Sequence, residues 1–127
     1  MKKVAITLPI LVVLAITWGL WMIRREMRSA FARDAVHMIA YEVTSLYRTN
    51  PNPTQGDIDD VMLHLHMASV INLTIDSNGK PRDPFGNPIR VRVDRKGKKL
   101  ETTVTSPGPD GRLDTADDIA YVDVSHE

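Results

Sequence analysis

The N-terminal stretch from Val4 to Ile23 is mostly apolar and contains no charged side chain. Basic residues flank it on both sides. A helix of about 20 residues is about 30 Å long, which matches the hydrocarbon core of a bilayer. A domain of this size cannot enclose a helix that is apolar on every side. The pattern therefore predicts an N-terminal transmembrane anchor over residues 1–23.

A cleaved signal peptide is the alternative to a retained anchor. Ala30-Phe31-Ala32 has the small-x-small form of a cleavage site. However, Arg24, Arg25 and Arg28 precede it, whereas a cleavable signal keeps this region uncharged. We expect the segment to be retained and the protein to cross the membrane once.

Apolar residues recur at helical spacing beyond the anchor, at Ala32, Val36, Ile39 and Val43. No Gly or Pro falls between Gly19 and Pro51. We therefore expect one helix from about Val4 to Arg48, with residues 24–53 forming its soluble extension and a linker. The two prolines of residues 50–53 end the helix, because each lacks an N–H donor and disfavours helical geometry in the residue before it.

The remaining residues, 54–127, predict a small α+β domain. Thr54 and Asp57 form a capping box ahead of a second helix with an apolar stripe. Residues 71–75 are extended and lead to a turn at residues 76–79. Alternation at residues 89–94, a turn at 95–98, and strands at 100–105 and 119–124 predict a three-stranded antiparallel sheet. Such a sheet packed on one long helix makes a stable two-layer fold.

Composition narrows the possible functions. Lys+Arg and Asp+Glu both number 16, and the chain has no cysteine, which excludes disulfides, thiolate zinc sites and a cysteine nucleophile. The sequence contains no catalytic or phosphate-binding motif, so we expect neither an enzyme nor a small-molecule substrate. The basic hairpin at residues 90–99 could contact anionic lipid or an acidic neighbour, but no aromatic residue interleaves it, and nucleic-acid binding is not expected.

Two loops carry specific patterns. The first, here called the proline loop, is Asp83-Pro84-Phe85-Gly86-Asn87-Pro88, a rigid turn in which Asp83 and Asn87 can close side-chain turns around the apolar Phe85. The second, the acidic loop, spans residues 105–119. Its carboxylates repel one another in a compact loop, and calcium suits such hard oxygen ligands. A solvated acidic turn is the alternative, and the spacing does not fit an EF-hand.

Together with the single N-terminal helix, the proline loop, the β-hairpin and the acidic loop resemble the major pseudopilin of bacterial type II secretion systems. In that family a DPWGNPY-like turn precedes the strands, and a later S-x-G-x-D-G loop that ends in a D-D-I element binds calcium. The resemblance implies a pilin-like fold and a structural Ca²⁺ ion. It assigns side-chain oxygens to Asp110, Asp117 and Asp118 and a backbone carbonyl to Ser106, with Asp114 a possible further ligand.

The resemblance also implies a place in the cell and partners. It predicts a bacterial inner-membrane protein with a periplasmic C-terminal domain, forming homo- or hetero-oligomers with pilin-like subunits and secretion machinery. A count of flanking basic residues alone would leave the domain in the cytoplasm. Thr7-Leu8-Pro9-Ile10 echoes the family's N-terminal apolar run but lacks its leader Gly and its Glu. A membrane-anchored, calcium-dependent binding module that never polymerises is therefore the alternative function.

Overall fold

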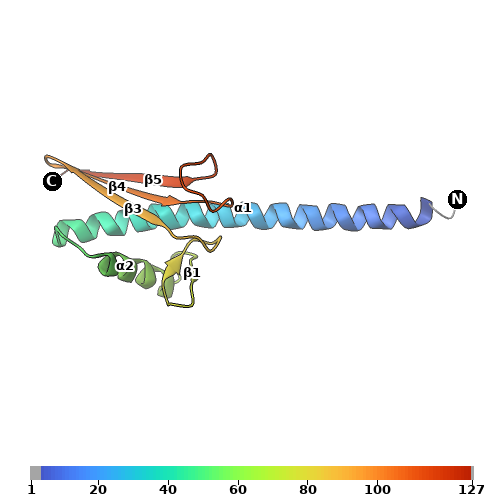
Figure 1. The fold of residues 1–127 in the computed structure, drawn as a ribbon, viewed down its shortest axis with the longest axis horizontal. Coiled ribbons are helices and arrows are strands. Elements are labelled where there is room, and N and C mark those ends of the chain that lie inside the picture. The colour runs from blue at the N-terminus through green and yellow to red at the C-terminus, as the bar shows by residue number, and fades with distance from the viewer. Residues whose placement is uncertain (1–3, 127) are drawn as a thin grey trace.

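The computed structural model describes residues 4–126, which form two helices, a two-stranded ribbon and a three-stranded sheet. In chain order the elements are α1 (Val4–Thr49), α2 (Gln55–Met67), β1 (Thr74–Ile75), β2 (Pro81–Arg82), β3 (Arg90–Lys96), β4 (Lys99–Ser106) and β5 (Ile119–His126). Figure 1 shows the sheet and α2 gathered around one half of α1, while the other half projects beyond them. The expected α+β architecture is confirmed.

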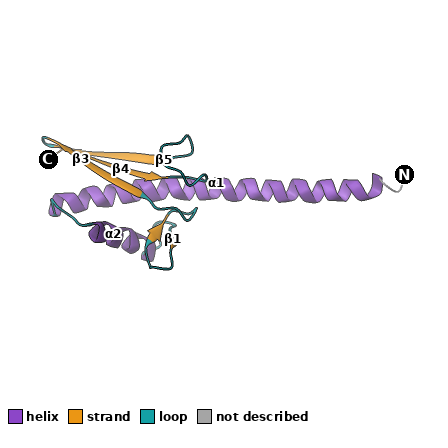
Figure 2. Cartoon of the chain, in the orientation of Figure 1, coloured by secondary structure: helices purple, strands orange, loops and turns teal. Residues whose placement is uncertain are grey.

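Helix α1 is one unbroken helix of 46 residues, as the absence of helix breakers after Gly19 predicts. Pro9 lies inside its first turns. The apolar side chains from Leu8 to Ile23 are exposed, at more than half of their surface for Leu8 and Trp18. This helix is long and apolar enough to cross a membrane, and the sheet and α2 lie alongside its other half (Figure 2).

The second half of α1 forms the centre of the hydrophobic core. Val36, Ile39 and Val43 are almost completely buried, and the same cluster includes residues of α2 and β4. Burial begins at Ala32, about two and a half turns beyond Ile23. The predicted soluble extension of the helix, residues 24–53, therefore shares one core with the predicted C-terminal domain.

The sheet has the strand order β3-β4-β5, with both pairs antiparallel. Strand β4 lies in the middle, and its Leu100, Thr102 and Val104 are fully buried, which is the alternation expected for a sheet with one face on a helix. The Thr102 hydroxyl lies 2.9 Å from that of Thr44 on α1, so the one polar residue of this buried row has a partner.

Helix α2 begins with the predicted capping box. The Thr54 hydroxyl accepts from the N–H of Asp57, and the Asp57 carboxylate accepts from the N–H of Thr54 at 2.8 Å. The extended segment predicted at residues 71–75 is a strand only at Thr74–Ile75, which pairs with the unpredicted strand Pro81–Arg82. Ile71 and Leu73 are buried, so their side chains fill the core without joining a ladder.

Candidate functional site

The proline loop and the acidic loop lie together at the end of the domain from which the apolar half of α1 projects (Figure 1). Asp83, fully buried, joins them. Its Oδ1 accepts from the N–H groups of Phe85 at 3.0 Å and Asn87 at 2.7 Å, and its Oδ2 accepts from the Ser106 hydroxyl at 2.6 Å. The side-chain turn at Asp83 is as predicted. Its bond to Ser106 was not predicted, because nothing in the sequence spacing brings those positions together.

Gly108 holds the acidic loop closed on itself. Its φ is +74°, and a Cβ built there would lie 2.2 Å from the Asp117 carbonyl oxygen. A side chain at this position is therefore excluded both by the backbone conformation and by space. The Gly108 carbonyl accepts from the Asn87 Nδ2 at 3.2 Å, which is a second link between the two loops.

Asp110 and Asp118 share a neighbour, Thr115. The Thr115 hydroxyl lies 2.7 Å from Asp110 Oδ2 and 3.5 Å from Asp118 Oδ1. Asp110 also accepts from the N–H of Arg112. That hydrogen bond, then the one from Thr115, holds the pKa of Asp110 below its usual value of 3.8. The ionised carboxylate, which is the form that binds a cation, is favoured here.

The other two acidic side chains point elsewhere. Asp114, in a left-handed conformation with φ of 64°, pairs with Arg90 at 3.1 Å on the exposed side of the loop. Asp117 makes no hydrogen bond or ion pair within residues 4–126 and lines a cleft against α1. The carboxylates repel one another, and their residues have different backbone conformations. The carboxylates therefore lie on different faces of the loop.

Ser106 is buried at the end of β4, in register with Ile119, and its hydroxyl is engaged by Asp83. Its predicted role as a calcium ligand uses its backbone carbonyl, which lies where β4 ends and the acidic loop continues. Within the described residues 4–126, no three His, Cys, Asp or Glu side chains are grouped closely enough to hold a metal ion. The predicted ligands are hard oxygens, which suit calcium. Of these, Asp110 and Asp118 lie on either side of one hydroxyl, that of Thr115.

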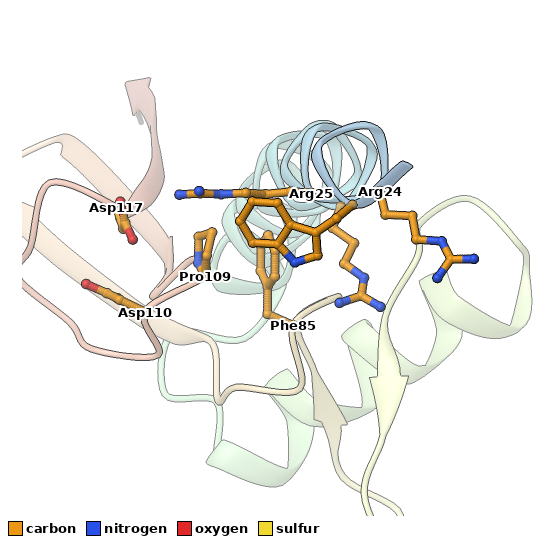
Figure 3. A pocket seen from close by; sticks show the side chains of 8 residues that line it. Arg24, Arg25, Phe85, Pro109, Asp110 and Asp117 are labelled. Carbon is orange, nitrogen blue, oxygen red and sulfur yellow. The ribbon is translucent and has the colours of Figure 1, made fainter. Parts of the chain in front are cut away.

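A cleft of about 530 Å³ separates the two loops from α1, and we call it the helix–loop cleft. Trp21, Arg24, Arg25 and Arg28 line its helix side, and Phe85, Asp110 and Asp117 line its loop side. Figure 3 shows Arg25 extending across the cleft toward the side that carries Asp110 and Asp117, while Arg24 points away from them. The Arg25 guanidinium carbon lies 5.6 Å from the centre of the Trp21 ring, close enough for a cation–π interaction.

The sequence did not predict this cleft, because periodicity gives no information on how far the loops extend along the helix. The only signal in the sequence is the cluster of arginines after Ile23, which predicts a membrane flank. The proline loop and the acidic loop lie at one end of the domain, and Asp83 links them. The chain matches no protein-family model, no curated protein and no solved structure.

Proposed function

We propose that the chain is a pseudopilin-like structural subunit of a type II secretion or type IV pilus-like apparatus. The observation that carries this proposal is the form of α1, a single helix whose first half is an exposed apolar rod and whose second half is the core of the domain. A rigid connection of this kind lets lateral packing of the apolar halves fix the positions of the domains. The domain is then periplasmic and the anchor lies in the bacterial inner membrane.

The charge distribution of the domain suits axial stacking of subunits. The turn between β3 and β4, with Lys96 and Lys98, lies at the opposite end of the sheet from the acidic loop (Figure 1). Two domains displaced along a common axis would bring the basic turn of one toward the acidic loop of the next, an attraction that acts over about 10 Å at 0.1 M salt. Lys96→Glu with Lys98→Glu should weaken assembly, whereas the same reversal at Lys80, outside the turn, should not.

Crosslinking in membranes tests polymerisation. The full chain, with an epitope tag after Glu127, is expressed in a bacterium that carries secretion machinery and treated with formaldehyde. A ladder of multimers is expected. The matched control carries the same residues 24–127 behind an unrelated single-span helix and should give monomer, because the apolar rod supplies the lateral contacts. Monomer alone with the native helix would contradict the proposal.

The alternative, a membrane-anchored calcium-dependent binding module that does not polymerise, is favoured by one observation. The span Val4–Ile23 contains no carboxylate, so it offers no buried charge for a neighbouring subunit's terminal amine. In that case native and exchanged anchors would give the same monomer, and the domain would still recruit a partner. The crosslinking experiment thus separates the two functions.

Both candidate functions include a bound calcium ion. We propose that it binds the acidic loop through Asp110 and Asp118, with Asp117 and the Ser106 carbonyl as further ligands. Binding would replace carboxylate repulsion with a shared cation. Thermal unfolding of the full chain in detergent should move to higher temperature with 1 mM calcium, by about 4–8 °C for each 1 kcal/mol of stabilisation. Asp118→Asn should remove the shift, and Asp123→Asn, on β5, should retain it. An equal melting temperature with calcium and with chelator would contradict calcium binding.

A further inference from the structure

The helix–loop cleft lies beside the end of the apolar stretch of α1. If the apolar stretch that ends at Ile23 fills the hydrocarbon core, then Arg24, Arg25 and Arg28 fall in the headgroup layer, and Trp21 lies at its inner boundary, where indole rings are favoured. The two loops reach down to these same helix residues, because Phe85 and Asp117 line the cleft with them. The cleft therefore opens onto the bilayer surface.

The two walls of the cleft carry opposite charge but do not neutralise each other. Within residues 4–126, Arg24, Arg25 and Arg28 form no ion pair within 4 Å, and Asp117 forms neither an ion pair nor a hydrogen bond. Arg25 and Asp117 also line a second cavity of about 450 Å³ on the neighbouring side of the loop. An occupant that satisfies both walls must present a negative group to α1 and a positive group to the acidic loop.

We propose that the helix–loop cleft binds the phosphoethanolamine headgroup of a bilayer lipid, with the phosphate held by the arginines of α1, chiefly Arg25, and the ammonium group held by Asp117. Guanidinium groups bind phosphate through charge-assisted hydrogen bonds. A primary ammonium donates hydrogen bonds to a carboxylate in the same way. The acyl chains then continue into the bilayer along the exposed apolar side of α1, past Trp21.

The charge pattern also predicts which lipids are disfavoured. A phosphoglycerol headgroup offers a phosphate for Arg25 but no cation for Asp117, which stays unpaired beside a negative ligand. A phosphocholine headgroup carries a positive charge without N–H donors, so it cannot form hydrogen bonds with Asp117. This inference uses the membrane position of α1 but needs neither polymerisation nor calcium. Where calcium takes Asp117 as a ligand, the ion and the lipid ammonium group compete for the same carboxylate.

Native mass spectrometry of the full chain, released from detergent with bound lipids, tests the proposal. The protein is equilibrated with equal amounts of phosphatidylethanolamine, phosphatidylglycerol and phosphatidylcholine with identical acyl chains, in the presence of chelator so that calcium cannot contribute. We expect phosphatidylethanolamine to be retained about tenfold over each of the others, equivalent to about one charge-assisted hydrogen bond. Equal retention of the three lipids, or a preference for phosphatidylglycerol, would overturn the proposal.

Variants assign the preference to the cleft. Asp117→Asn should bring phosphatidylethanolamine and phosphatidylcholine to near parity, and Arg25→Gln should reduce retention of all three lipids. Asp114→Asn removes the same charge from the same loop but outside the cleft, and it should keep the wild-type preference. An unchanged preference in Asp117→Asn, or an equal loss in Asp114→Asn, would show that the cleft does not select the headgroup.

Free glycerophosphoethanolamine in millimolar excess distinguishes a lipid site from a site for a soluble phosphate compound. It should leave the retained lipid in place, because it lacks the acyl chains that bind along α1. Displacement of the lipid by this compound would overturn the assignment to a bilayer lipid. Loss of the crosslinked ladder with an intact lipid preference would count against the proposed filament alone, since the mass spectrometry is done on dispersed protein.

Discussion

Replacement of Asp83 by Ala should destabilise the domain more than any other single change in the two loops. The fully buried carboxylate accepts two backbone N–H groups of the proline loop and the hydroxyl of Ser106. Without it, the N–H groups of Phe85 and Asn87, both in half-buried residues, lose the fully buried acceptor that orders the proline loop. Each unsatisfied buried donor costs about 1–3 kcal/mol, and the hydroxyl of the fully buried Ser106 loses its acceptor as well.

The expected loss is therefore about 3–5 kcal/mol, a large part of the 5–15 kcal/mol that stabilises a typical domain. Pulse proteolysis of the full chain in detergent and urea measures it, because the folded domain resists cleavage. With a urea dependence of about 2 kcal/mol per molar, the midpoint should fall by about 1.5–2.5 M. Asp83→Asn keeps one oxygen for the two N–H groups and should lose about 1 kcal/mol.

The matched control is Asp60→Ala on α2, where the carboxylate is exposed and makes no hydrogen bond within the described chain. Its midpoint should stay within the range of about 0.5 kcal/mol that is typical of surface substitutions. If Asp83→Ala unfolded at the same urea concentration as Asp60→Ala, the buried carboxylate would not be the link between the loops, and the reasoning would fail.

Three further outcomes follow from the structure. Gly108→Ala should lower the free energy of unfolding by about 3 kcal/mol, because a strained φ is combined with a clash against backbone. Gly97→Ala has a similar φ of +59° but open space around it, and it should lose about 1 kcal/mol in the same proteolysis assay. Thr54→Ala should cost about 1 kcal/mol by removing the cap of α2. Backbone N–H donors hold the pKa values of Asp76 and Asp110 below 3.8 in the folded state. The two carboxylates therefore contribute their full stabilisation above pH 3.8, and this is lost as the pH falls through their folded-state pKa values. A melting temperature that stayed constant below about pH 4 would contradict this.

The elements with long, regular patterns could be predicted from the sequence. The apolar periodicity and the lack of helix breakers give α1 to within a residue of its end at Thr49, and alternation gives the hairpin and the buried row of β4. Local chemistry was equally informative at Thr54, because a capping box involves neighbouring residues only. In each case the signal lies within one stretch of chain.

Features that depend on contacts between distant segments could not be predicted. One local feature was also missed: strand β2 begins with Pro81, a residue that is unfavourable in most strands, so the pattern did not indicate its pairing with β1 across the predicted turn. The bond between Ser106 and Asp83 requires the folded sheet. The same limit applies to the acidic loop, where sequence grouped Asp114 and Asp117 with the other acids but the structure turns them to different faces.

The two loops lie between the helix–loop cleft and the sheet, and a short series of contacts joins them. Ser106 is the last residue of β4, and it bonds to Asp83, which organises the proline loop that leads into β3. Gly108 packs against the backbone of Asp117, whose side chain lines the helix–loop cleft. A ligand at Asp117 would thus affect the start of β3 and the end of β4 through contacts between the two loops. These contacts do not involve α1. Under the proposed function, with the continuous helix α1 anchored in the bilayer, the same ligand would restrain the orientation of the domain relative to the membrane, and regular packing of neighbouring subunits would depend on that orientation.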